Sequence, residues 1–154
     1  MFILHEEIKI LLRDPGTIKI LATVNDQGVP HAVRKETVEA GDGESLMLPE
    51  RFESSRTNSN LVHSLWFGRR AALTLLAEDG RAFEILAAPV QCHITGPLFE
   101  RYYRRMNSLM AALWILRPEE ARNETPRFRQ AEEEAAHPLF LHPDRIAKEE
   151  RLDP

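Results

Sequence analysis

The alternation of apolar and polar residues predicts one helix followed by three short strands. Leu4, Ile8, Leu11 and Leu12 repeat at helical spacing, so they predict an amphipathic first helix that Asp-Pro-Gly ends at 14–16. The next apolar stretches are rich in residues that favour strands, and turn-forming residues separate them. These strands are expected at 17–24, 31–40 and 44–49. Because the connections are short, we expect the three strands to form a meander.

Further along the chain, helices alternate with longer strands. Residues 55–67 predict a helix on which Leu61, Val62, Leu65 and Trp66 share one face. Strands are expected at 70–77, 81–95 and 111–116, with a helix opening at 96–97 and a short helix at 132–136. Pro89 lies inside the long strand and predicts a bend or bulge there. Six antiparallel strands with inserted helices predict a mainly β protein, of α+β type, built as a small closed or split barrel.

Composition and charge exclude several classes of protein. The 154 residues fit one domain, and the net charge of −4 has both signs mixed throughout. No basic stripe favours nucleic acid, and no apolar run reaches the ~20 residues that cross a bilayer. Cys92 is the only cysteine, which excludes an internal disulfide and a thiolate metal cluster. A reducing, cytoplasmic location is therefore expected, with Cys92 in the core or the barrel wall.

The segment 54–68, SSRTNSNLVHSLWFG, carries the strongest functional signal. Ser54 or Ser55 can cap the helix, and Gly68 can end it. A helix that opens with free N–H groups, two serines, Arg56 and Thr57 can hold an anion such as a phosphate. The alternative interpretation is an ordinary capped helix whose first turn faces water.

Two cations in the middle of a predicted strand form a second candidate. Arg34 and Lys35 lie within HAVRKETVEA, where one of them should point inward or toward a partner. A cation inside a barrel wall is costly unless it is paired, so an anionic ligand is one possible partner. The alternative is an edge strand whose lysine faces solvent.

The remaining residues indicate little dedicated catalytic chemistry. The chain has no glycine-rich phosphate loop, no nucleophile elbow and no His spacing suited to a metal, so no metal site is expected. Trp66 and Trp114 could stack on a flat ligand, although burial in the core is the more frequent case. Arg101, Arg104 and Arg105 either pair with acids across a dimer contact or face water.

Several segments, in this order and spacing, resemble the pyridoxamine 5′-phosphate oxidase-like FMN-binding split barrels. The resemblance covers roughly residues 1–120, in the style of the small bacterial FMN-binding proteins. The segments are 18–24 (IKILATV), 26–33 (DQGVPHAV), 46–49 (LMLP), 54–61 (SSRTNSNL), 70–75 (RAALTL) and 96–100 (GPLFE). The resemblance implies a six-stranded antiparallel split β-barrel with flanking helices over 1–126. Residues 127–154 are expected to form a tail packed on the barrel or on a partner subunit.

The resemblance also implies a homodimer with FMN at the subunit interface. Ser55, Arg56 and Thr57 would hold the phosphate, with Asn60 nearby. Val33, Arg34, Lys35, Leu48 and Pro49 would line the isoalloxazine edge. Arg56 stands where many members carry lysine, and its guanidinium can bind phosphate at two points.

The function expected from this resemblance is an FMN-dependent oxidoreductase that uses NAD(P)H to reduce a small acceptor. The alternatives are a non-catalytic FMN protein that transfers electrons, or a flavin-free dimeric barrel that binds a ligand or a protein. The chain lacks the substrate phosphate-binding set that the vitamin-forming oxidases carry near their carboxyl end, which argues against pyridoxamine phosphate as substrate. Heme is a further cofactor found among the family's relatives.

Overall fold

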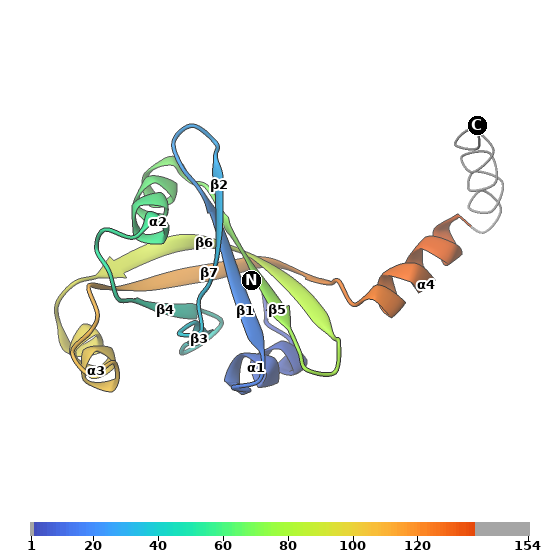
Figure 1. Ribbon diagram of the computed structural model, residues 1–154, viewed down its shortest axis with the longest axis horizontal. Helices are drawn as coiled ribbons and strands as arrows, with labels where there is room; N and C mark the ends of the chain where they lie inside the picture. Colours follow the sequence, from blue (N-terminus) through green and yellow to red (C-terminus); the bar gives the residue numbers. More distant parts are fainter. Residues whose placement is uncertain (1, 138–154) are drawn as a thin grey trace, which may run out of the picture.

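The computed structural model describes residues 2–137, which form an antiparallel sheet curled into a half-barrel with helices around it (Figure 1). The helices are α1 (Glu6–Arg13), α2 (Arg56–Phe67), α3 (Pro97–Arg105) and α4 (Pro126–Ala136). The strands are β1 (Ile18–Val24), β2 (Pro30–Arg34), β3 (Glu39–Ala40), β4 (Leu46–Glu50), β5 (Ala71–Leu76), β6 (Ala82–His93) and β7 (Ala112–Asn123). The predicted fold class, a mainly antiparallel split barrel with flanking helices, is confirmed.

The sheet has one strand more than the six expected, because the predicted strand 31–40 is interrupted. The strand order is β2-β1-β5-β6-β7-β4-β3. The backbone N–H of Lys35 still donates to the carbonyl of Lys19, and that of Val38 then donates to the carbonyl of Lys35. This turn ends the pairing with β1, so residues 39–40 join the opposite edge of the sheet as β3.

The predicted meander of the first three strands is wrong. β2 pairs only with β1, whereas β4 pairs with β3 and with the distant β7, so that Leu48 lies opposite Trp114. After the turn at 35–38, the chain continues to β3 and β4 at the opposite edge of the sheet instead of back along β2.

The long strands bend where the proline predicts. The pairing of β6 with β7 shifts register between Leu86 and Ala87 and again between Pro89 and Gln91, as bulges do. β7 also runs beyond the expected end at 116, because its second half continues to pair with β6 as far as Asn123. These bends allow one pair of strands to follow the curve of the barrel.

Two apolar clusters lie on opposite faces of β4, and all five residues of this strand are buried. Leu46 and Leu48 belong to the barrel core, where they pack with Trp114 and with the predicted apolar face of α1. Met47 belongs to a second cluster, under α3, with Phe99. β4 is thus held from both sides, and the loop that follows it begins at a fixed point.

Helix α2 covers the barrel with a face that is mostly polar. Its buried residues are Thr57, Asn60, Leu61 and Ser64. Trp66, for which a core position was the more frequent expectation, is 79% exposed, because it lies on the face of α2 that points away from the barrel. Trp114, by contrast, is fully buried.

Cys92 is exposed, which excludes the core position, and it lies in β6, a strand of the barrel wall, the other position expected for it. It belongs to the last residues of β6, where the strand leaves the barrel core and Gln91 is exposed as well. Partial burial of the Cys92 thiol nevertheless raises its pKa, because it disfavours the charged thiolate. Among the described residues, no helix has the length and apolar character needed to cross a membrane.

Candidate functional site

The start of α2 is a capped helix terminus with an exposed arginine. Ser55 is the N-cap, with extended backbone angles, and its Oγ accepts the N–H of Asn58 at 3.0 Å. The first turn contains no acidic residue, and Arg56 is exposed. The free N–H groups of a first helical turn and an arginine beside them favour a bound oxyanion.

Side chains from two strands fix this first turn in place. The indole Nε1 of buried Trp114 donates to Oδ1 of Asn58 at 2.9 Å, and Asn58 Nδ2 donates to the carbonyl of Glu53 at 3.1 Å. One turn further on, Asn60 Nδ2 donates to Oγ1 of Thr23 at 3.0 Å, and both residues are buried. These bonds tie α2 to β7 and β1, so Ser55 and Arg56 are presented from a rigid element.

A cavity of about 250 Å³ lies beside the loop that leads from β4 to α2. Its walls come from the end of β2, the turn after it and the end of β4. The lining residues include Arg34, Lys35, Pro49, Glu50, Arg51 and Phe52. The carbonyl of Phe52 accepts the N–H of Ser55 at 3.2 Å, so one tight turn connects the cavity rim to the cap of α2.

Both cations of the predicted strand have acidic partners. Lys35 Nζ lies 2.8 Å from Oε2 of Glu50, which is only 1% exposed. Arg34 NH2 lies 2.7 Å from Oε1 of Glu36, and this pair is exposed. Lys35 therefore follows the paired-cation interpretation, with a partner from its own chain. Within residues 2–137, no acidic side chain lies at ion-pair distance from Arg51 or Arg56.

The nine predicted site residues fall into two groups. Six of them lie at the cavity or the start of α2, on β2, or at the end of β4: Val33, Arg34, Lys35, Pro49, Ser55 and Arg56. The other three have buried side chains: Leu48 in the barrel core, Thr57 under α2, and Asn60 on Thr23. Leu48 and Thr57 could therefore offer a ligand their backbone groups, while Asn60 holds the helix. Their roles toward a cofactor stay predictions.

Two residues of this region escaped sequence reasoning. Glu50 is the acidic last residue of the otherwise apolar strand β4, and a buried acid at that place is a signal that a cation lies nearby. Asn58 had no distinguishing signal, because its partner Trp114 is far away in the chain. Glu50 sets the charge beside Lys35, and Asn58 sets the position of the first turn.

A larger cavity, of about 630 Å³, opens between α1, the 36–40 turn and the end of α3. Lys19 lies in its wall and is 7% exposed. Its Nζ donates to the carbonyls of Val38, at 2.6 Å, and Glu36, at 3.4 Å. Burial lowers the pKa of Lys19, and the nearby carboxylates of Glu36 and Glu39 oppose that effect. The lysine thus supports the turn that interrupts the predicted second strand.

In the part of the chain that the structure describes, no group of three His, Cys, Asp or Glu side chains is arranged to hold a metal ion. At the candidate site, Lys35 is paired with Glu50 and Arg34 with Glu36, whereas Arg51 and Arg56 have no acidic partner among residues 2–137.

Solved structures share this architecture, although sequence comparison alone finds no relatives. No protein-family model matches the chain, and no curated protein sequence matches it. A candidate pyridoxamine 5′-phosphate oxidase from Lactobacillus delbrueckii has 21% identity and a TM-score of 0.62, over 77% of this chain and 93% of that one. An FMN-binding protein from Syntrophomonas wolfei has 13% identity and a TM-score of 0.64, over 77% and 84% of the two chains.

A third structure with this fold is HutZ, the heme storage protein from Vibrio cholerae. It has 15% identity and a TM-score of 0.56, over 79% of this chain and 95% of that one. At these identities the likeness concerns the fold. The protein has the split-barrel fold of the pyridoxamine 5′-phosphate oxidase-like proteins, as its sequence motifs predict.

Proposed function

Starting from this fold, we propose that the protein forms a homodimer, binds FMN and acts as an oxidoreductase with this cofactor. The observation that carries the proposal is the start of α2, where Ser55 caps a helix whose first turn has an exposed arginine and no acid. Proteins with this fold include one whose name records FMN binding. The residues around α2 supply groups suited to the phosphate and to the flavin ring of that cofactor.

The phosphate is assigned to the start of α2. Ser55 Oγ and the Arg56 guanidinium would donate to its oxygens, and the backbone N–H of Thr57 would add to the positive end of the helix. FMN differs from riboflavin only by this dianionic group, so the helix terminus would provide selectivity between them. The bonds from Trp114 and Thr23 to α2 keep these donors in place before the ligand arrives.

The flavin ring is assigned to the cavity beside Lys35 and Pro49. A single chain offers about 250 Å³ there, below the roughly 300–1,000 Å³ typical of pockets for ligands of this size. The exposed ring of Phe52 at the rim also lacks a cover. Both features support a site that a second subunit completes, in agreement with the expected homodimer.

Once bound, the flavin would supply the electron and hydride transfer, and the protein would supply binding, orientation and charge. Lys35 and Arg34 would lie near the ring edge, where positive charge stabilises a reduced flavin. Glu50 and Glu36 offset that charge, so the two acids would limit how far the cations raise the reduction potential. A hydride from NAD(P)H and a small acceptor complete the proposed reaction.

The same ion pairs favour a second candidate function. Because Lys35 and Arg34 already have partners in their own chain, the barrel needs no anionic ligand to satisfy them. A flavin-free dimeric barrel that binds another ligand or a protein is therefore the alternative. The fold also occurs in a heme storage protein, so the same experiment should detect heme.

An absorption spectrum of the purified protein, with and without added FMN, tests the proposal. We expect a flavin spectrum, and quenching of flavin fluorescence on titration with FMN but much less with riboflavin. Equal affinity for both flavins would contradict the phosphate assignment. A colourless protein that takes up no flavin, or one with a heme band, would overturn the proposal. Turnover of NAD(P)H with an acceptor then separates the enzyme from an electron-transfer protein that binds FMN without catalysis.

A further inference from the structure

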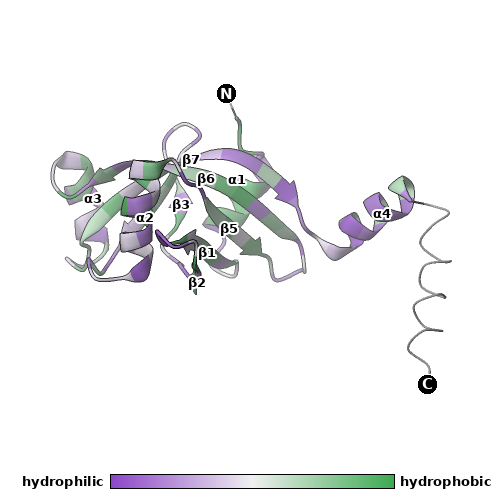
Figure 2. Ribbon diagram, turned by 90° about the horizontal axis from the view of Figure 1, so that it is seen from above, coloured by the Kyte–Doolittle hydropathy of each residue, from purple (hydrophilic) through white to green (hydrophobic). Residues whose placement is uncertain are grey.

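Among residues 2–137, no element packs against helix α4. Each of its residues is exposed, and none is buried. In two views at right angles, it stands away from the half-barrel, beyond the ends of β6 and β7 (Figures 1 and 2). Most of a helix's stability in proteins comes from packing an apolar face, so α4 lacks its usual source of stability.

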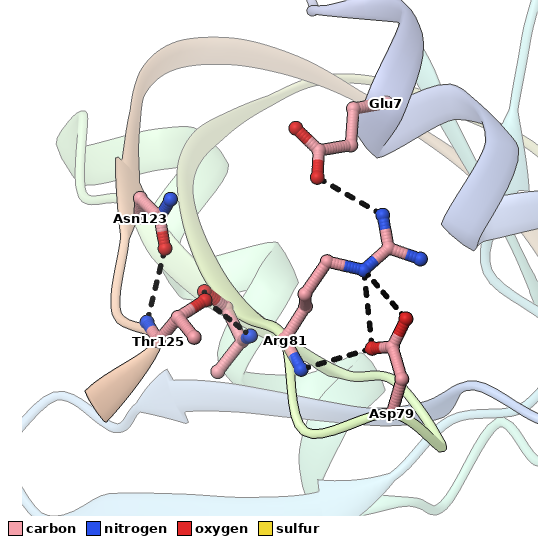
Figure 3. A network of polar contacts seen from close by, with 6 residues as sticks. Glu7, Asp79, Arg81, Asn123 and Thr125 are labelled. Atoms are coloured by element: carbon pink, nitrogen blue, oxygen red, sulfur yellow. Dashed lines mark hydrogen bonds and ion pairs between the residues drawn. The ribbon is translucent and has the colours of Figure 1, made fainter. Parts of the chain in front are cut away.

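The base of α4 is nevertheless held firmly to the barrel (Figure 3). Thr125 Oγ1 accepts the N–H of Ala82 at 3.0 Å, and the N–H of Glu124 donates to the carbonyl of Ala82 at 2.8 Å. The N–H of Thr125 donates to Oδ1 of Asn123 at 3.0 Å. Next to Ala82, Arg81 bonds to Glu7 of α1. The direction in which α4 leaves the barrel is therefore fixed.

The sequence of α4 gives it little stability as an isolated helix. It has 11 residues, below the ~12–15 at which isolated helices are marginal in water, and no side chain caps its start. Arg127 and Arg129 lie near its N-terminus and Glu132–Glu134 near its C-terminus, which opposes the helix dipole. Local support comes from the ion pairs of Arg129 with Glu132 and Glu124, and from the bond of Gln130 to Glu134. A surface that packs against α4 would supply the missing stability.

One side of α4 is suited to such a surface. Phe128, Ala131 and Ala135 share one side of the helix at helical spacing, and Phe128 is 47% exposed. Glu132 and Glu134 lie on either side of this stripe. The surface that receives α4 should thus be apolar in its centre and basic around it.

The outer face of α2 has these properties. Val62, Leu65 and Trp66 form an apolar stripe on the side turned away from the barrel, with exposed fractions of 42%, 37% and 79%. The segment 54–70 has no aspartate or glutamate; Arg56 begins α2, Arg69 follows its end, and Arg70 lies 3.9 Å from Glu120. The two helices are therefore complementary in both apolar character and charge.

Within one chain the two helices cannot meet, because α2 and α4 lie toward opposite ends of the molecule's long axis (Figures 1 and 2). In a two-fold symmetric dimer, a contact between α4 of one subunit and α2 of the other would be made twice. We propose that α4 is an exchanged arm, and that its Phe128-Ala131-Ala135 side docks on the Val62-Leu65-Trp66 face of α2 in a second copy of this chain. The proposal rests on the homodimer of the proposed function and is independent of the flavin.

Disulfide trapping in full-length protein tests this contact. In a Cys92→Ser background, Leu65→Cys and Ala131→Cys are combined, and the control pairs Leu65→Cys with Gln130→Cys, on the opposite side of α4. Under mild oxidation, we expect the first pair to form covalent dimers in high yield and the control pair to form few. A protein that is dimeric by light scattering but gives no more crosslink than its control would overturn the docking alone.

A second measurement uses no cysteine chemistry. Phe128→Ser should raise the dissociation constant of the dimer roughly tenfold or more, as loss of a buried aromatic contact does at an interface. Gln130→Ser should leave it unchanged, and an equal effect of both would overturn the proposal. A chain that is monomeric at all concentrations would overturn both the docking and the homodimer. FMN titration of the same samples reports separately on the cofactor.

Discussion

Lys35 and Glu50 form an ion pair that joins the residue directly after β2 to the end of β4, two strands that are not neighbours in the sheet. The Nζ–Oε2 distance is 2.8 Å, and the exposed fractions of the side chains are 17% and 1%. Glu50 is also the last residue of a strand whose every side chain is buried. The pair therefore links two walls of the cavity at the candidate site.

Removing one partner of this pair should lower the free energy of unfolding more than removing the charges of both partners. Lys35→Met leaves a buried carboxylate without its partner, so we expect the free energy of unfolding to fall by about 3 kcal/mol. Lys35→Met combined with Glu50→Gln should recover most of that loss. Urea unfolding of the single and double variants measures both effects. Equal stability of Lys35→Met and wild type would show that the pair is not formed in solution.

Arg56→Glu should weaken FMN binding while the fold stays intact. Loss of one charge-assisted hydrogen bond costs roughly 1.5–3 kcal/mol, which is about ten- to a hundredfold in affinity before repulsion is added. Quenching of flavin fluorescence measures the dissociation constant, and Arg104→Glu, on the exposed side of α3, is the matched control. Unchanged affinity in the Arg56 variant would place the phosphate elsewhere.

Asn60 and Thr23 provide a test of how α2 is attached to the barrel. Asn60→Ala leaves the buried Oγ1 of Thr23 without its donor, so the free energy of unfolding should fall by about 1–3 kcal/mol. Thr23→Val together with Asn60→Leu should be less destabilised than Asn60→Ala, because both polar groups are then removed. Thermal or urea unfolding measures the stability of both variants. A larger loss in the double variant would contradict a pairwise bond.

The buried lysine predicts a particular dependence of stability on pH. Burial lowers the pKa of Lys19, so between that lowered value and 10.5 the unfolded chain binds more protons than the folded chain. Over this pH range, the contribution of Lys19 to the free energy of unfolding rises with pH. At lower pH, Lys19 is charged in both states, and the full cost of burying its charge is present. The difference in unfolding free energy between wild type and Lys19→Met should therefore shift in favour of wild type as pH rises. A difference that stays constant with pH would contradict this assignment.

Local structure could be predicted from the sequence, whereas distant pairing could not. The stripe of Leu4, Ile8, Leu11 and Leu12 predicts α1 and its buried face, because a 3.6-residue period reports directly on one side of a helix. The pairing of β4 with β7 left no such signal, since strand periodicity identifies a strand but not its neighbour. The turn after Arg34 escaped detection because it contains neither glycine nor proline.

The candidate site shows the same limit. The cap at Ser55 and its exposed Arg56 follow from residue types in sequence, and the structure places both at the start of α2. The apolar stripe of α2 was also predicted, but periodicity does not tell which face the protein's own barrel covers. Thr57, Asn60 and Ser64 pack inward instead, leaving Trp66 outside. Burial of polar residues there depends on partners such as Thr23, which lie on other strands.

The double burial of β4 has a consequence for the order of folding. β4 pairs with the distant β7, and Trp114 of β7 bonds to Asn58 across 56 positions of the chain. Both contacts require closure of a long loop. Because loop closure costs entropy, such contacts form later than hairpins. We expect the β1–β2 and β5–β6 hairpins to form early and the turn that presents Ser55 and Arg56 to be assembled last. Nascent or partly unfolded chains would then lack affinity for a phosphate, and added FMN would slow unfolding rather than accelerate refolding.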